Sequence, residues 1–318
     1  MPILLVSNTR DLTTDLVVHE LASSGHPFIR LNCDALREAR LSFSFGGGAL
    51  ALAFAHKGAV VDASTIRAAY LRRPLLDGVI DVSGSDAAYQ LGEWRALLEG
   101  LYSALEGRWL NEPTAMDRAE DKLRQLRLAS AIGLQVPRTL VSNDRAQIAD
   151  FVGQAPAVAK PLRNGRLGRR GDEAVVFTTR LDSISEADDA AIEAAPFIVQ
   201  EEVPKFADVR VTVVGNDIFA VKIASQVDED AQVDWRRGDL VSLAHEAFEL
   251  PQPAAGQCVE LVKALGLRFG AIDLVLDQQD RYWFLEINPN GQWGWIQSRT
   301  GQPIAGAIAR ELLEIAAQ

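Results

Sequence analysis

Two strand-like runs near the C-terminus constrain the fold most, because they combine apolar residues with polar ones at strand spacing. The runs FGAIDLVLD and RYWFLEIN are separated by a short polar turn, and this pattern predicts an antiparallel hairpin. Pairing the strands around a turn at the two glutamines places Asp273 opposite Phe284. The sequence therefore predicts an antiparallel sheet close to the end of the chain.

Three polar side chains of this hairpin, Asp273, Glu286 and Asn288, are predicted to share one face. Buried polar groups need partners, so this face must supply them. Two carboxylates and one amide oxygen suit Mg²⁺, a hard cation that keeps waters and shares its shell with nucleotide phosphates. For Asp273 alone, a hydrogen-bonded polar face or a charge at a strand end is the alternative.

A basic loop with regularly spaced glycines follows another strand-like run, AVAKPL, whose lysine is Lys160. Glycines three apart, Gly165 and Gly168, let backbone N–H groups approach phosphate oxygens, and a lysine at the base of the loop supplies positive charge. The loop is not a P-loop, because the lysine precedes the glycines. It predicts either a phosphate-binding flap or an ordinary mobile surface loop.

An extended segment with two acidic residues is typical of a site for a nucleotide base and ribose. Its residues are Gln200, Glu201, Glu202 and Val203. The backbone of such a segment suits the base, and a carboxylate such as Glu201 or Glu202 suits the ribose hydroxyls. An ordinary strand would have the same pattern.

Asp208 and Arg210 lie two residues apart on the next predicted strand and therefore share a face. In that position Arg210 is a candidate to neutralise a phosphoryl group in a transition state. A salt bridge along or across the strands is the alternative.

The composition excludes several classes of protein. The formal net charge of -11 argues against a general nucleic-acid-binding protein, which needs a basic surface. Cys33 and Cys258 are the only cysteines, so neither a disulfide framework nor a cysteine metal site is expected, and a reducing cytoplasm is the expected location. The start of the chain lacks a basic leader, and no apolar run is long enough to span a membrane.

The length of 318 residues predicts two or three packed units of the α/β and α+β classes. Residues 1–112 alternate strands and helices and predict an α/β unit. Residues 113–200 predict a small α+β unit with a flap. Residues 201–318 predict antiparallel strands and a closing helix, and the run FIVQEEV is grouped with these strands.

Taken in order, these parts resemble the ATP-grasp superfamily over nearly the whole chain. The resemblance implies an N-terminal pre-ATP-grasp α/β domain followed by two ATP-grasp subdomains. It implies that Lys122, inside the predicted helix EPTAMDRAEDKLRQLRLASAIG, and Lys160 contact the phosphates of ATP. It also implies that the polar face of the hairpin binds Mg²⁺, that the QEEV segment and the following aspartate contact the nucleotide, and that Arg210 is the catalytic arginine of a DxR-type motif.

Finer motifs are similar to those of the ribosomal-peptide maturases that make microviridins and related graspetides. These motifs are YLRRP, EDKLRQLRLASAIGLQVPRTLVSN, KIASQ followed by DWRR, and FLEINPNGQWGWI. The resemblance implies an ATP-dependent enzyme, expected as a homodimer, that acts on a precursor peptide with a leader and an acidic core. Such an enzyme activates Asp or Glu side chains as acyl phosphates and joins them to Thr or Ser hydroxyls or Lys amines. Lys222, Arg236 and Arg237 are then candidates to bind the acidic core.

Three other functions fit the same ATP site. A ligase that uses a free amino acid, or the terminus of a ribosomal protein, differs only in the acceptor. A small-molecule kinase stops at phosphoryl transfer and leaves a stable phosphoester. A non-catalytic peptide-binding module would be expected to lack Lys160 or the metal carboxylates, and this chain has all of them.

Overall fold

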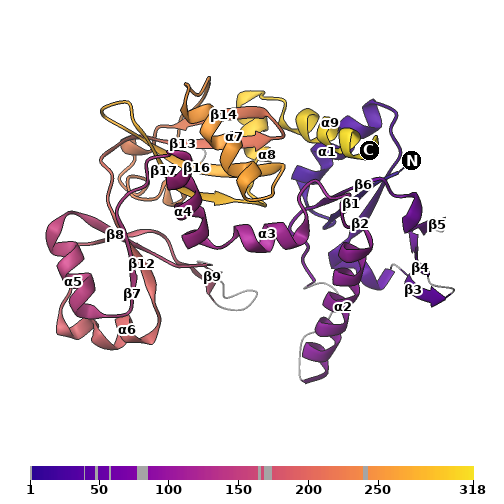
Figure 1. Cartoon of the computed structure of the whole chain (residues 1–318), viewed down its shortest axis with the longest axis horizontal. Helices are drawn as coiled ribbons and strands as arrows, with labels where there is room; N and C mark the ends of the chain where they lie inside the picture. The colour runs from indigo at the N-terminus through magenta and orange to yellow at the C-terminus, as the bar shows by residue number, and fades with distance from the viewer. Residues whose placement is uncertain are drawn as a thin grey trace.

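The computed structural model describes residues 2–38, 40–46, 49–56, 59–76, 85–163, 166–167, 174–238 and 243–318. In Figure 1 the first segment of the chain lies on the right, the middle segment at the lower left, and the last segment across the top. No helix in the described part of the chain is long and apolar enough to cross a bilayer.

The first segment contains a parallel sheet in the order β2-β1-β6 and an antiparallel sheet in the order β3-β4-β5. Its elements are β1 (Ile3–Ser7), α1 (Leu12–Ser23), β2 (Phe28–Asn32), β3 (Arg40–Gly46), β4 (Ala49–His56), β5 (Ala59–Asp62), β6 (Ala68–Leu71) and α2 (Ser85–Ala104). The strand β1 is buried along its whole length and is apolar except for Ser7 at its end, as the central strand of a parallel sheet should be. The predicted alternation of strands and helices is present at the start of the chain, where β1, α1 and β2 follow one another.

The single helix predicted after the first segment is two helices. Helix α3 (Pro113–Ala119) ends before α4 (Lys122–Ile132) begins. Asp121 separates them, because its carboxylate accepts hydrogen bonds from two backbone N–H groups in the first turn of α4. The prediction of one continuous helix was therefore wrong, and Lys122 is the first residue of α4.

The middle segment forms a four-stranded antiparallel sheet in the order β11-β8-β12-β7. Its elements are β7 (Thr139–Ser142), α5 (Arg145–Gln154), β8 (Ala157–Lys160), β9 (Arg166–Leu167), β10 (Ala174–Val175), β11 (Thr179–Leu181), α6 (Asp189–Ala194) and β12 (Phe197–Glu201). This sheet has a small core of its own, in which Ile148 and Phe151 of α5 pack on Val199. Grouping FIVQEEV with the C-terminal strands was wrong, because β12 pairs with β7 and β8.

The last segment contains a five-stranded antiparallel sheet in the order β15-β14-β13-β16-β17. Its elements are β13 (Lys205–Val214), β14 (Asp217–Ile223), β15 (His245–Phe248), α7 (Ala254–Ala264), β16 (Phe269–Asp277), β17 (Tyr282–Asn288), α8 (Gly294–Thr300) and α9 (Ile304–Ala316). The antiparallel hairpin of β16 and β17 confirms the feature that most constrained the sequence analysis. Helices α5, α7 and α8 and strand β15 were not predicted.

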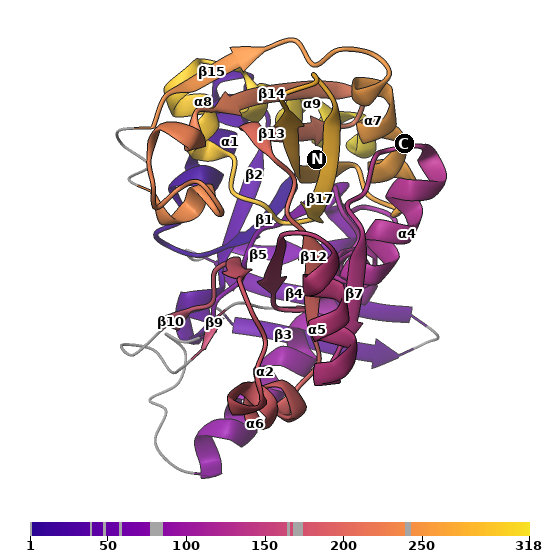
Figure 2. The same cartoon turned by 90° about the vertical axis from the view of Figure 1, so that its left-hand side faces the viewer.

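The two ends of the chain pack together. Val17 and Leu21 of α1 belong to the same buried cluster as Ile308 and Leu312 of α9, and Figure 1 shows both termini on this side of the molecule. In Figure 2 the middle segment faces the viewer, and β12 lies below β17. The middle sheet therefore meets the C-terminal sheet at a junction, while the boundaries at residues 112 and 200 stay a prediction.

Candidate active site

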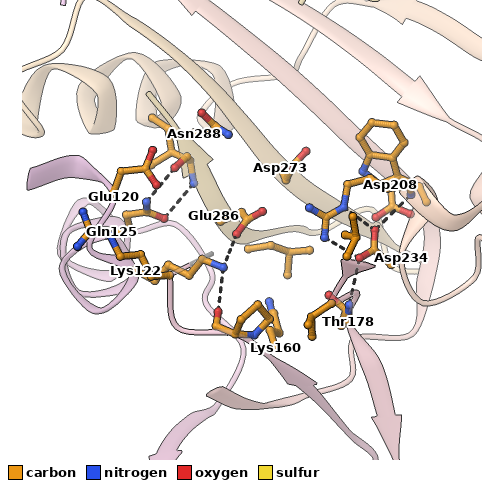
Figure 3. A pocket seen from close by; sticks show the side chains of 18 of the residues that line it. Glu120, Lys122, Gln125, Lys160, Thr178, Asp208, Asp234, Asp273, Glu286 and Asn288 are labelled. Atoms are coloured by element: carbon orange, nitrogen blue, oxygen red, sulfur yellow. Dashed lines mark hydrogen bonds and ion pairs between the residues drawn. The ribbon is translucent and has the colours of Figure 1, made fainter. Parts of the chain in front are cut away.

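A cavity of about 770 Å³ lies between helix α4, the middle segment and the five-stranded sheet. Figure 3 labels ten of its lining residues: Glu120, Lys122, Gln125, Lys160, Thr178, Asp208, Asp234, Asp273, Glu286 and Asn288. In that view Glu286 lies between the side that carries Lys122 and the side that carries Asp234. Most of the side chains predicted to bind ATP phosphates and a metal are thus brought to one cavity.

Three oxygen-bearing side chains predicted to bind a metal line this cavity. Asp273 on β16 is directly opposite Glu286 on β17, and Asn288 is two residues further along β17. The predicted pairing of Asp273 with Phe284 was wrong, because Leu274 pairs with Phe284 and a β-bulge at Leu285 then shifts Asp273 to a position opposite Glu286. The extra residue lets Phe284 enter the core while Glu286 faces the cavity. The shared polar face is therefore present, although the register differs.

This donor set fits a divalent cation that prefers oxygen. Asp273 Oδ1 is buried without a hydrogen-bond partner among the described residues, and burial raises the pKa of this carboxyl. Its other oxygen, Oδ2, accepts a hydrogen bond from Arg210 Nη1 at 2.7 Å. Asn288 Oδ1 accepts from Asn290 N at 2.9 Å and keeps a second lone pair. The described residues contain no group of three His, Cys, Asp or Glu side chains that could hold a metal, so an amide must complete this set.

Two lysines from different segments approach Glu286. Lys122 Nζ lies 3.0 Å from Glu286 Oε2 and donates a hydrogen bond to Pro161 O at 3.1 Å. Burial lowers the pKa of Lys160 to about 8, although the charge of Glu286 opposes this shift. Burial also opposes ionisation of Glu286, but the charges of Lys122 and Lys160 hold its pKa below the ordinary value. The site therefore gathers positive charge around one ionised carboxylate.

The glycine-rich flap predicted after Lys160 is described in part. Strands β9 and β10 pair antiparallel, so the chain turns back on itself here. Val175 and Val176, on the returning side, line the cavity. Gly165 and Gly168 lie outside the described residues, and their contact with phosphate stays a prediction.

A second cavity of about 50 Å³ adjoins the first and is lined by the segment predicted to hold the nucleotide base. The segment contributes Gln200, Glu201, Glu202 and Val203, and both cavities share Lys160, Thr178, Val233 and Leu285. The carboxylate of Glu202 is paired with Arg180 at 2.7 Å. Glu201 lies 3.5 Å from Arg138. Either carboxylate would have to exchange its partner to bind a ribose.

Asp208 and Arg210 share a face of β13, as predicted, but they do not pair with each other. Asp208 lines the cavity and lies 3.0 Å from Lys205 Nζ. Arg210 is buried and forms a salt bridge with Asp273 on the neighbouring strand β16. The structure thus contains a cross-strand salt bridge at Arg210, and its catalytic role stays a proposal.

The three cations predicted to bind peptide have different surroundings in the structure. Arg236 lines the cavity, but Asp234 accepts hydrogen bonds from its Nε at 2.8 Å and from its Nη2 at 2.6 Å, which raises the pKa of Arg236. Arg237 stacks on a phenylalanine ring instead, with 5.7 Å between the guanidinium carbon and the ring centroid. Lys222 lies on the sheet face opposite the cavity, 3.7 Å from Glu246. The structure does not bring Lys222 to the site.

Gln125 positions the site and was not predicted. Its buried side chain donates from Nε2 to Ala119 O at 2.6 Å and to Ile287 O at 2.8 Å, and its Oε1 accepts from Ile287 N at 3.0 Å. These bonds fix the start of α4, which carries Lys122, to the strand that carries Glu286. The available signal was its position three residues after Lys122, on the same face of the helix.

The first segment reaches the same site through two adjacent arginines of YLRRP. Arg72 is fully buried, lies 3.4 Å from Asp11 Oδ2 and donates from Nη1 to Gly291 O at 3.1 Å. Arg73 lines the cavity and donates from Nε to Asn290 O at 3.0 Å. Both arginines therefore hold the loop that directly follows β17.

The sequence of residues 119–312 matches the family description of a RimK-like ATP-grasp domain. The chain belongs to the RimK-like ATP-grasp family. This ATP-grasp chain is 29% identical to probable alpha-L-glutamate ligase 1 of Shewanella amazonensis over 260 residues, which are 77% of this chain and 79% of that protein. It is 31% identical to a probable alpha-L-glutamate ligase of Vibrio parahaemolyticus over 209 residues, which are 63% of this chain and 65% of that protein.

Solved ATP-grasp structures match the chain along nearly its whole length. A RiPP-associated ATP-grasp ligase of Chryseobacterium gregarium, in complex with ADP and a leader and core peptide, has a TM-score of 0.88 and 28% identity, and covers 98% of this chain and 96% of its own. The macrocyclase MdnC of Microcystis aeruginosa, bound to its precursor peptide MdnA, has a TM-score of 0.85 and 28% identity, over 99% of this chain and 100% of its own. The predicted ATP-grasp fold and the resemblance to peptide-maturing ligases are confirmed.

Proposed function

We propose that this chain is an ATP- and Mg²⁺-dependent ligase that closes rings in a ribosomally made precursor peptide. The rings join Asp or Glu side chains to Thr or Ser hydroxyls or to Lys amines. The observation that carries this proposal is the similarity, over 98% of the chain, to a ligase whose structure holds ADP with a leader and core peptide. The cavity supports it, because two lysines and a strand face rich in oxygen ligands line the same space.

The lining residues divide into a nucleotide side and a metal side. Lys122 and Lys160 would hold the phosphates of ATP, and the small cavity along β12 would hold the base. Asp273, Glu286 and Asn288 would hold Mg²⁺. The metal would neutralise charge on the phosphoryl group during its transfer.

Activation is needed because a carboxylate is a poor acyl donor in water. A carboxylate oxygen of the peptide attacks the γ-phosphorus of ATP, the bond to ADP breaks, and an acyl phosphate forms. A hydroxyl or amine of the same peptide then attacks the acyl carbon, phosphate leaves, and the nucleophile releases its proton. Lys160 would neutralise charge during the transfer, and Arg210, held by Asp273, would steady the acyl phosphate.

The substrate is proposed to be a peptide with a leader and an acidic core. Arg236 lines the cavity within reach of such a core, provided that its pair with Asp234 opens. Arg237 lies next to it in the same turn. A homodimer stays a prediction, which light scattering of the purified protein checks directly.

Mass spectrometry tests the proposal. The purified protein is incubated with ATP, Mg²⁺ and the peptide encoded by a short neighbouring reading frame rich in Thr, Ser, Asp and Glu. Each ring is expected to remove about 18 Da from the peptide and to form one ADP, since condensation through an acyl phosphate releases one water. The Glu286→Gln protein should form neither product, whereas Glu193→Gln, at an exposed position on α6, should match the wild type.

A glutamate ligase is the second candidate, because the named sequence relatives are probable alpha-L-glutamate ligases. With free glutamate present, that activity adds the mass of glutamate residues to the peptide or protein substrate. A peptide kinase would instead add the mass of a phosphate group. Either mass gain without dehydration would replace ring closure as the proposed function.

A further inference from the structure

Arg73 has a strained backbone at the edge of the cavity. Its φ angle is 42°, in the left-handed region that residues other than glycine rarely adopt. Buried Asn8 holds this conformation, because its Nδ2 donates to Arg73 O at 2.6 Å and its Oδ1 accepts from Leu75 N at 2.7 Å. Strain that the surroundings maintain is concentrated at functional sites, so the conformation of Arg73 calls for a functional reason.

The turn at this position separates two neighbouring arginines with different surroundings. Arg72 is fully buried and holds Asp11 and Gly291. Arg73 is half-buried and lines the cavity, and its Nε donates to Asn290 O. The left-handed conformation therefore sends the second arginine to the cavity while the first stays inside the protein.

The position of Arg73 along the cavity indicates what it would meet. Leu285 of strand β17 lines both cavities, and the strand then continues through Glu286 and Asn288 and leads to Asn290. Because Arg73 donates a hydrogen bond to Asn290 O, it lies at the end of the cavity that is remote from the segment that would hold the base. In the proposed function, this end lies beyond the terminal phosphate, where the accepting carboxylate must sit.

The cations expected to bind acidic side chains are held in different ways in the structure. Arg236 is paired through two nitrogens with Asp234, and Lys222 faces away from the cavity. Arg163 also lines the cavity but is exposed in the loop after β8. Arg73 differs from these because its backbone is fixed by a buried side chain and its guanidinium is oriented by a backbone carbonyl.

We propose that Arg73 binds the side-chain carboxylate of the peptide that receives the phosphoryl group. This assignment rests on the proposed function and names a residue that selects acidic side chains for it. The planar guanidinium suits a carboxylate and holds it in one orientation, which a lysine ammonium does not. The contact would set both the choice of Asp or Glu and the direction of attack on ATP.

Direct binding measurements test the assignment. Calorimetric titrations in the presence of ADP and Mg²⁺ compare the wild type with Arg73→Gly, Arg73→Lys and Arg310→Met. The probes are the peptide of the neighbouring reading frame and the same peptide with Asn and Gln in place of Asp and Glu. Glycine is used because it adopts a positive φ without strain. Arg310→Met controls for net charge, because Arg310 of α9 is an exposed arginine paired with Asp217 of β14.

The wild type and Arg310→Met are expected to bind the acidic peptide about 10- to 100-fold more tightly than the amide peptide, the range for hydrogen bonds to a charged group. Arg73→Gly should abolish most of this preference without changing the affinity for ADP or the unfolding temperature. Arg73→Lys should keep part of this preference, because lysine carries the positive charge but lacks the planar, bidentate guanidinium.

An unchanged preference in Arg73→Gly would overturn the assignment, and so would a loss of ADP affinity in place of peptide affinity. The readout does not depend on ring closure. A protein that loses its acidic preference in Arg73→Gly, yet never dehydrates the peptide, would refute the proposed function and leave the carboxylate site standing.

Discussion

Nucleotide binding is expected to weaken above pH 8 because Lys160 loses its proton there. Burial lowers the pKa of this ammonium from 10.5 to about 8, and the phosphates of ATP bind only its charged form. The apparent dissociation constant should therefore grow by the factor 1 + 10^(pH − 8). That factor rises from about 1.1 at pH 7 to about 11 at pH 9, so the affinity falls about tenfold over this interval.

The assay is a titration of the protein with a non-hydrolysable ATP analogue and Mg²⁺ at closely spaced pH values from 7 to 9. The matched variant is Lys160→Arg, whose guanidinium stays charged throughout. It should lose the pH dependence, and Lys160→Met should bind weakly and equally at every pH. A wild-type affinity that stays constant up to pH 9, or a Lys160→Arg protein with the same pH dependence, would refute the reasoning.

The same pKa has the opposite effect on folding. The folded-state pKa of Lys160 lies below the value of 10.5 for a free lysine, so the unfolded chain binds more protons between pH 8 and 10.5. Relative to Lys160→Met, the wild type should therefore gain stability as the pH rises through this window. Urea denaturation of both proteins at pH 7.5 and 9.5 measures the difference.

Three further substitutions test how the site is held. Gln125→Leu removes three buried hydrogen bonds and should lower the free energy of unfolding by about 3 kcal/mol in urea, at about 1 kcal/mol each; a loss below 1 kcal/mol would contradict their role. Gly291→Ala would bring its Cβ into a clash with Ala271 Cβ and to 2.8 Å from Arg210 Nη2, so ATP turnover should fall, whereas Gly92→Ala, an exposed helical control with open space around it, should keep turnover and gain up to about 1 kcal/mol. Arg72→Met leaves the Asp11 carboxylate without its buried partner and should lower the free energy of unfolding by about 3–5 kcal/mol. An unchanged denaturation midpoint would contradict a stabilising role of this pair.

The side chains that meet at the site were predictable where spacing along one element decides their direction. Asp208 and Arg210 are two residues apart on a strand, so their shared face follows from the geometry of the backbone. The same rule placed Glu286 and Asn288 together at the end of β17. Alternation along a single strand needs no knowledge of the rest of the fold.

Other features depend on choices that the local sequence leaves open. The apolar spacing around Asp121 is compatible with one long helix, but the carboxylate of Asp121 caps the start of a second helix. Lys122 is therefore the first residue of α4. The bulge at Leu285 adds one residue to the pairing, which no hydrophobic pattern specifies, and it turns Phe284 and Glu286 to opposite faces of the sheet. Nothing in spacing alone connects Arg72 with Gly291, since 219 positions separate them.

The contact between the first segment and the loop after β17 limits how such ligases can be recombined. The family match starts at residue 119, which suggests a natural crossover point just before α4. A chimera joined there would pair residues 289–293 with the first segment of another enzyme. Arg72, which is fully buried, would then lose acceptors such as Gly291 O for its hydrogen bonds. Exchanges that carry the loop together with residues 68–75 would keep the two halves matched. In an alignment of such enzymes, these two short stretches should therefore vary as one unit, although they lie at opposite ends of the chain.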